Sequence, residues 1–238
     1  MTISYNRLGS NGRLGNQMFQ YAGLRGIAAN RGYDWLIPRP DSYGDSNYGL
    51  FDCFEMGSVE EKNFGKLNAP SIATGQFHFS QDFFDGCPDN TNLHDYFTTE
   101  KYFANIKDVI RKDFTFKKEI LEPCKEIVDE LENPIFMHVR RGDYVVNPSA
   151  HPMCPISYYE KALELFDENS PVLVFSDSIE WCKEQEFFQG DRFMLSEYDE
   201  KYSQTADTLL GRQNTLIPYF DLCMMTLCNG GIIANSTM

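Results

Sequence analysis

The sequence lacks several features that would place it in a specialised class of protein. No run approaches the ~20 consecutive apolar residues that a membrane-spanning helix needs, and residues 1–15 lack the apolar core of a signal peptide. The seven cysteines form no Cys-x-x-Cys pair and no cluster with histidine at zinc spacing. We therefore expect a cytoplasmic chain with reduced thiols, without a transmembrane segment and without a metal site.

Positive charge is also scarce. The 238 residues include 21 Lys and Arg against 35 Asp and Glu, which gives a formal net charge of −14. Nucleic acids and anionic membranes are bound through fields of basic side chains, so we expect neither as a general partner. Peripheral association with a membrane is left open, but nothing in the charge pattern supports it. A phosphorylated ligand would need a local basic cluster.

The order of the expected elements indicates an α/β fold made of two halves. Apolar runs typical of strands alternate with periodic segments typical of helices, a pattern that favours parallel sheets covered by helices. Strands are expected at 2–5, 34–38, 135–139, 171–175, 193–196 and 231–234, and helices at 16–30, 102–113, 119–132, 157–166, 177–187 and 216–228. Residues 39–100 show no clear period. Pro134 should end the helix before it, so we expect the halves to be residues 1–132 and 133–238.

The segment GRLGNQMFQYA, residues 12–22, predicts a glycine turn that leads into a helix. A helix N-terminus presents unpaired N–H groups and a partial positive charge, both of which suit a phosphate. Gly12 and Gly15 would allow a ligand to approach the backbone closely. A tight turn without a ligand is the other interpretation, and the residues alone do not decide between the two.

The strand expected at 135–139 is followed by Arg140, Arg141, Gly142 and Asp143. Ligands of open α/β sheets bind beyond the carboxyl ends of strands. Neighbouring residues of an extended segment point to opposite sides, so one arginine could face a ligand while the other braces the loop through Asp143. The planar guanidinium fork suits a phosphate. A purely structural ion pair with Asp143 is the alternative.

Polar residues also follow two further strands. Ser176 and Asp177 could bind a base or a ribose, although Asp177 could equally cap the next helix. The last strand is followed by three more polar residues, Asn235, Ser236 and Thr237. The chain contains no Asp-x-Asp pair, so we do not expect a metal-chelating site for a sugar nucleotide.

These motifs, in this order, resemble those of glycosyltransferase family 11, the α-1,2-fucosyltransferases. HVRRGDYV at 138–145 matches the family's H-x-R-R-x-D pattern, and GRLGNQMFQYA matches its N-terminal loop. Four more segments are similar to family blocks: HDYFTTEKYF, HPMCPISYYEKAL, FSDSIEWCKE and DLCMMTLCNGGIIANST. Any one block is weak, but the ordered set reaches from residue 12 to residue 237 and is specific.

The resemblance implies a GT-B-like architecture of two Rossmann-like lobes with parallel sheets. Residues 1–132 would be the acceptor-side lobe and residues 133–238 the GDP-sugar-binding lobe. Family members usually continue beyond the A-N-S-[ST] block, so the second lobe is expected to be truncated and incomplete. The implied reaction is inverting, metal-independent transfer of fucose from GDP-fucose to a glycan hydroxyl, above all the 2-hydroxyl of a galactoside. GDP-fucose is the donor substrate, and no cofactor is expected.

Two alternatives stay open at this point. The chain could transfer another GDP-linked sugar, with a different linkage or a protein acceptor. It could also be a non-catalytic GDP-sugar-binding protein, because the segment after the last family block is missing.

The resemblance also implies roles for single residues. Arg140 would grip the donor diphosphate, and His138 and Asp143 would shape the same pocket. Asn16 would contact the phosphate or the acceptor from the other lobe, beside Gly12 and Gly15. The remaining donor contacts would come from Ser176, Asp177, Asn235, Ser236 and Thr237. The expected catalytic residues are thus Arg140, Asp143 and Asn16. Asp143 and His151 are both candidates for the general base, and the sequence does not decide between them.

Overall fold

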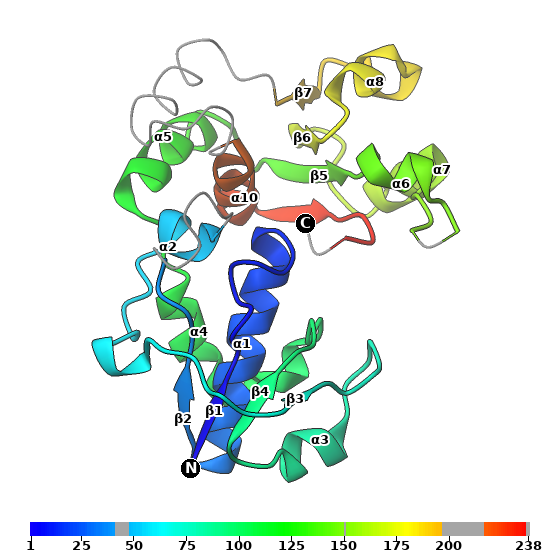
Figure 1. Cartoon of the computed structure of the whole chain (residues 1–238). Helices are drawn as coiled ribbons and strands as arrows, with labels where there is room; N and C mark the ends of the chain where they lie inside the picture. The colour runs from blue at the N-terminus through cyan, green and yellow to red at the C-terminus, as the bar shows by residue number, and fades with distance from the viewer. Residues whose placement is uncertain (41–47, 150, 197–216, 237–238) are drawn as a thin grey trace. The chain divides into compact units, whose positions relative to one another are not determined.

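The computed structural model describes residues 1–40, 48–149, 151–196 and 217–236, and it has the expected α/β class. The chain forms two compact units, residues 1–117 and 118–236, each with a four-stranded sheet (Figure 1). The units divide earlier than the boundary expected after residue 132. The reason is that α5 (Lys118–Val128) packs against α10 (Ile217–Leu227) in the second unit.

The sheet of the first unit is parallel throughout, with the strand order β2-β1-β4-β3. Its strands are β1 (Thr2–Ser4), β2 (Asp34–Leu36), β3 (Ser71–Ile72) and β4 (Thr91–Leu93). The sequence predicts β1 and β2, whereas β3 and β4 lie within residues 39–100, where the sequence shows no clear period. Because all four strands run in the same direction, their carboxyl ends lie at one edge of the sheet.

Helix α1 (Leu14–Arg31) runs along this sheet (Figure 1). Two of its glycines allow another segment of the chain to pack closely against it. A Cβ atom at Gly26 would lie 1.9 Å from the carbonyl oxygen of Tyr102, and one at Gly23 would lie 2.7 Å from Phe97. The chain around residues 97–103 therefore lies directly on the helix backbone. The other helices of this unit are short: α2 (Gly49–Cys53), η2 (Glu61–Asn63), α3 (Gln81–Gly86), η3 (Glu100–Tyr102), η4 (Ala104–Ile106) and α4 (Lys107–Asp113).

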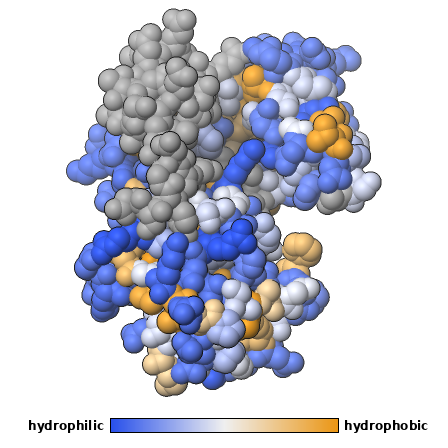
Figure 2. All heavy atoms as spheres, viewed as in Figure 1, coloured by the Kyte–Doolittle hydropathy of each residue, from blue (hydrophilic) through white to orange (hydrophobic). Residues whose placement is uncertain are grey.

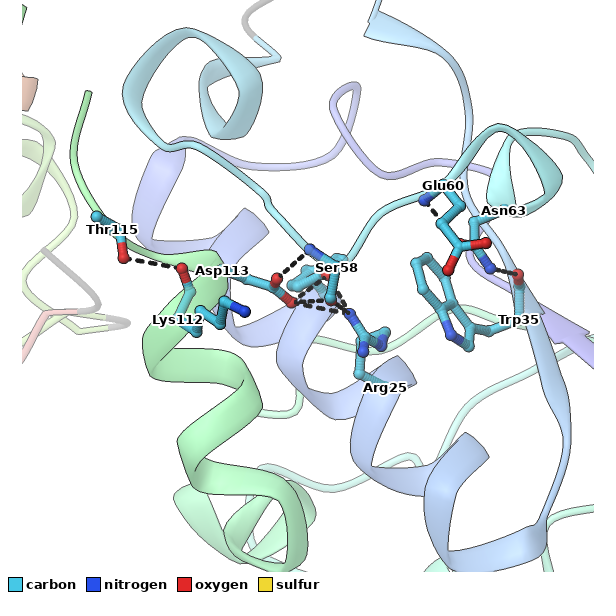
Figure 3. A network of polar contacts seen from close by, with 9 residues as sticks. Arg25, Trp35, Ser58, Glu60, Asn63, Lys112, Asp113 and Thr115 are labelled. Atoms are coloured by element: carbon cyan, nitrogen blue, oxygen red, sulfur yellow. Dashed lines mark hydrogen bonds and ion pairs between the residues drawn. The ribbon is translucent and has the colours of Figure 1, made fainter. Parts of the chain in front are cut away.

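A buried ion pair joins α1 to the end of α4 (Figure 3). Arg25 Nη1 lies 2.9 Å from Asp113 Oδ2, and the Asp113 side chain is fully buried. The Asp113 carboxylate also accepts hydrogen bonds from the Tyr21 hydroxyl at 2.7 Å and from the amide and hydroxyl of Ser58 at 2.8 and 2.7 Å. The Arg25 guanidinium lies 4.3 Å from the centre of the Trp35 ring. One carboxylate thus ties together α1, α4 and the segment after α2.

The sheet of the second unit is also parallel, with the order β7-β6-β5-β8. Its strands are β5 (Ile135–Val139), β6 (Val172–Ser176), β7 (Phe193–Leu195) and β8 (Gly230–Ile232). Between them come α6 (Gly142–Val146), α7 (Ile156–Leu163), α8 (Ile179–Glu184) and η5 (Glu186–Phe188). The core is built on the inner strands, with Met137, Val172 and Val174 completely buried. This burial explains why β5 and β6 are continuous apolar runs.

Hydrophilic residues dominate the coloured surface in Figure 2, and the hydrophobic patches on that face are small and separate. Among the described residues, no helix combines the length and apolarity needed to cross a bilayer.

Replacing Asp113 with alanine should strongly destabilise the first unit. The substitution leaves the Arg25 guanidinium without its buried partner, a change that typically costs about 3–5 kcal/mol. Urea unfolding followed by circular dichroism measures the loss. Asp108 is the matched control, because its pair with Arg111 is exposed, so Asp108→Ala should change stability by roughly 0.5 kcal/mol or less. Equal losses in the two variants would contradict a structural role for the buried network.

Candidate functional site

Three of the predicted segments meet at the carboxyl edge of the second sheet. Val139 pairs with Ser176 in the register of β5 and β6, and Met137 pairs with Ile232 in the register of β5 and β8. The residues that follow these strands therefore begin at the same edge. This edge brings together the loop after β5 (residues 140–143, here called the arginine loop), Asp177 after β6 and Asn235 after β8.

Arg140 is held on this edge by two carboxylates. Its Nη1 atom lies 2.9 Å from Asp177 Oδ2, and its Nη2 atom pairs with Asp143. The guanidinium also lies 5.3 Å from the centre of the Tyr144 ring. Only 12% of the Arg140 side chain is exposed, and its Nε atom is buried without a hydrogen-bond partner among the described residues. The positive charge is thus fixed in place, with one donor still unused.

Arg141 is braced differently from the sequence-based expectation. Asp143, the expected brace, pairs with Arg140, whereas the Arg141 guanidinium lies 3.8 Å from the centre of the Trp181 ring. The two arginines still have separate environments, as alternation along an extended segment predicts. Trp181, on α8, was not expected at the site. Nothing in the spacing of the sequence connects it to an arginine 40 positions earlier.

Asp177 connects the whole arginine loop. One carboxylate oxygen accepts the backbone N–H of Arg141 at 2.9 Å, and the other pairs with Arg140. Gly142 has a φ of +23°, and a Cβ atom there would lie 2.3 Å from Asp177 Oδ2. The glycine is needed because any side chain would displace this carboxylate. Asp177 does not cap α8, since Ser178 is the N-cap residue and makes no side-chain capping bond.

His138 lies behind the arginine loop, at the end of β5. It is 8% exposed, and burial lowers the pKa of its imidazole below the usual value, an effect that Asp177 opposes and Arg140 reinforces. The imidazole is therefore neutral at pH 7. It can therefore exchange hydrogen bonds without adding a second cation beside Arg140. Ser176, which pairs with Val139 in the sheet, accepts the backbone N–H of Ser178 at 3.0 Å.

The segment after β8 is tied to the loop that follows α6. The Tyr144 hydroxyl donates to the carbonyl of Asn235 at 3.2 Å, and the Asn235 amide donates to the carbonyl of Pro152. The Tyr144 ring stacks on His151 with centres 4.7 Å apart. Asn235 thus braces the site through its main chain and its side chain. Ser236 is described, and its N–H donates to Ala234, whereas Thr237 lies outside the described residues.

The glycine turn before α1 belongs to the first unit. Gly12 has a φ of +82°, and a Cβ atom there would lie 2.6 Å from the Asn16 side chain, so the glycine lets Asn16 fold over the turn. Helix α1 begins at Leu14, two residues earlier than expected, and Gly15 and Asn16 therefore lie in its first turn. The Gln17 side chain donates to Gly12 O at 3.1 Å, a contact that the sequence pattern did not reveal.

The buried His138 should make folding stability depend on pH. Its pKa is near 6.5 in the unfolded chain and lower in the folded one, so below about pH 6.5 the unfolded state binds a proton that the native state does not. This contribution to stability is complete above that pH and is lost as the pH falls. Urea unfolding at pH 7.5 and 5.5 should show a smaller decline in His138→Gln than in wild type. The control His78→Gln, at an exposed position, should decline as wild type does.

Comparison with known proteins identifies the family. The model described as "Glycosyl transferase family 11" matches residues 76–238. An alpha-1,2-colitosyltransferase of Escherichia coli is 28% identical over 100% of this chain and 85% of its own length. The O-antigen biosynthesis glycosyltransferase WbnK of Escherichia coli is also 28% identical, over 61% of this chain. Human galactoside alpha-(1,2)-fucosyltransferase 1 is 26% identical over 95% of this chain. The matches span 47% of WbnK and 61% of the human enzyme.

Solved structures show the same fold. The crystal structure of NodZ alpha-1,6-fucosyltransferase soaked with GDP-fucose aligns with a TM-score of 0.56, covering 99% of this chain and 89% of NodZ at 13% identity. A structure of fucosyltransferase NodZ from Bradyrhizobium also gives 0.56, at 14% identity. The family match covers more than half of the sequence. It includes the arginine loop, Asp177 after β6 and Asn235 after β8. The chain belongs to glycosyl transferase family 11.

Proposed function

We propose that the chain transfers fucose from GDP-fucose to a glycan hydroxyl, with inversion at the sugar carbon. Family membership supports a glycosyltransferase. The names of the relatives support an α-1,2 linkage to a galactoside, and the NodZ structure soaked with GDP-fucose has the same fold. The 2-hydroxyl of a galactoside is therefore the proposed acceptor group.

The observation that supports this proposal is the burial and position of Arg140. It is a largely buried cation at the carboxyl edge of a parallel sheet, where open α/β folds bind their ligands. When the bond between fucose and GDP breaks, the departing diphosphate gains negative charge. A fixed guanidinium stabilises that charge more in the transition state than in the ground state, which accelerates the reaction.

The two carboxylates on Arg140 have different roles in this proposal. The side chain of Asp177 is 26% exposed and also holds the Arg141 amide, so it stays as the fixed brace. The Asp143 side chain is 60% exposed and can turn into water at little desolvation cost, which frees the guanidinium for phosphate. We therefore assign Asp143 to holding Arg140 until a phosphate replaces it.

In the first unit, helix α1 begins without a side-chain cap, and helix N-termini present N–H groups that suit a phosphate or a hydroxyl group. In the second unit, the Arg140 guanidinium would provide the electrostatic stabilisation that a divalent cation provides in other transferases. We therefore propose that transfer needs no added metal ion.

A second donor deserves a direct test because an alpha-1,2-colitosyltransferase is 28% identical over the whole chain. Colitose is fucose without its 3-hydroxyl group, so the second candidate donor differs in the sugar and is tested as its GDP-linked form. The deciding experiment incubates the protein with each GDP-sugar and a panel of galactosides. Mass spectrometry then detects products, and NMR assigns the linkage and the anomeric configuration. Absence of product from every donor would overturn the proposed activity.

Replacing Arg140 with alanine should lower the rate of transfer by about 10²–10³, the usual cost of losing one donor that stabilises transition-state charge. Arg140→Lys keeps the charge but loses the fork and should recover only part of the rate. Turnover is measured by GDP release, and circular dichroism checks the fold. Arg111→Ala removes an exposed arginine and should leave turnover unchanged. Near-normal turnover of Arg140→Ala would refute the diphosphate role.

Removing metal ions should have little effect on turnover. Extensive treatment with EDTA, followed by assay in metal-free buffer, should leave the rate within about twofold of the untreated protein, because the Arg140 guanidinium is proposed to supply the positive charge. The control restores Mg²⁺ or Mn²⁺ to the treated sample. A rate that falls to background and returns only with the metal would contradict the electrostatic role assigned to Arg140.

A further inference from the structure

The first unit has a cavity of about 250 Å³ that the donor site does not use. It lies at the carboxyl edge of the sheet, between the residues that follow β3 and those that follow β4, beside the loop that leads to α1. The residues that matter for its chemistry are Asn11, Gln76, Phe77, His94, Asp95 and Tyr96. Its volume is just below the roughly 300–1,000 Å³ typical of small-molecule sites, so it suits one sugar ring rather than a nucleotide.

An exposed aromatic ring lines this cavity. Phe77 is 84% exposed, although most large apolar side chains of the described residues are buried. A single exposed apolar residue needs no explanation, but this ring and Tyr96 line a hollow that also contains amide, imidazole and carboxylate groups. A sugar ring presents an apolar C–H face and a rim of hydroxyl groups. Aromatic rings surrounded by short polar side chains match both parts.

The loop that carries Phe77 is anchored. Asp95 accepts the backbone N–H of Thr74 at 2.8 Å and also binds the Thr74 hydroxyl. Its other oxygen accepts the N–H of Tyr96 at 2.8 Å, and its carbonyl accepts the Tyr5 hydroxyl at 2.7 Å. The Asp95 side chain therefore orients the loop on which the ring lies. A loop backbone that is already ordered loses little freedom on binding, which favours affinity.

The charge around the cavity indicates which sugars fit. Arg7 Nη1 lies 3.2 Å from His94 Nε2, so one cation stands near the single carboxylate of Asp95. The whole chain carries a net charge of −14. This field disfavours phosphorylated or sialylated glycans and leaves neutral saccharides as the favoured class.

We propose that this cavity is the acceptor subsite, in which Phe77 stacks on one neutral sugar ring while the polar rim holds its hydroxyl groups. The proposal rests on the proposed function for the identity of the acceptor, a galactoside. It adds where that galactoside binds and which residue contacts it.

The kinetic test compares Phe77→Ala, Phe77→Trp and wild type with lactose as the acceptor and GDP-fucose as the donor. Phe77→Ala should raise the KM for lactose about fivefold, the factor expected for one lost aromatic contact, and leave the KM for GDP-fucose unchanged. Phe77→Trp keeps a stacking face and should restore the lactose KM. Leu165→Ala is the matched control, because Leu165 is also 84% exposed but lies in the second unit. An unchanged lactose KM in Phe77→Ala overturns the proposal.

A binding test does not depend on turnover. Saturation-transfer NMR with lactose should show signals from the galactose C–H protons with wild type and with Leu165→Ala, and much weaker signals with Phe77→Ala. Absence of these signals with wild type, or equal signals with Phe77→Ala, overturns the subsite. If lactose binds through Phe77 but no fucose is transferred, the subsite stands and the proposed function fails. If transfer proceeds with an unchanged lactose KM, the function stands and the subsite fails.

Discussion

The carboxylate of Asp177 is the interaction on which the arrangement of the candidate site depends. It binds the guanidinium of Arg140 with one oxygen and the backbone N–H of Arg141 with the other. The contact is close enough to favour glycine at position 142, the first residue of α6, because a Cβ atom there would lie 2.3 Å from Asp177 Oδ2. Without Asp177 the loop after β5 would have no fixed path, and the burial of Arg140 would be unfavourable.

The parallel sheet makes this contact possible. Asp177 and Arg140 are 37 positions apart in the sequence, yet β5 and β6 pair in register, so the residues after them start from one edge. The same geometry in the first unit places the residues after β3 and β4 around the cavity that contains Phe77. In both units, short loops carry the polar side chains, and the strands fix where each loop begins.

Much of this architecture could be predicted from the sequence, and the exceptions have physical reasons. The buried strands β5 and β6 stand out as apolar runs, and helix α1 is long enough to show its period. Strands β3 and β4 have two and three residues and lie within residues 39–100, where loop residues leave no apolar run or period around them. The stacking of Arg141 on Trp181 and the ion pair of Arg25 with Asp113 join residues that are distant in the sequence. Such pairs follow from packing, which propensity and spacing do not reveal.

The negative charge of the chain gives the arginine loop a further property. In a chain of net charge −14, an unpaired guanidinium would attract any anion, but Arg140 is already neutralised by two carboxylates. A ligand must therefore replace the exposed Asp143 contact with something better. A single weak anion would gain little by this exchange, whereas a diphosphate would bring two charged groups. If Arg140 binds a diphosphate as proposed, the competing Asp143 carboxylate would contribute to selectivity as much as the arginine itself.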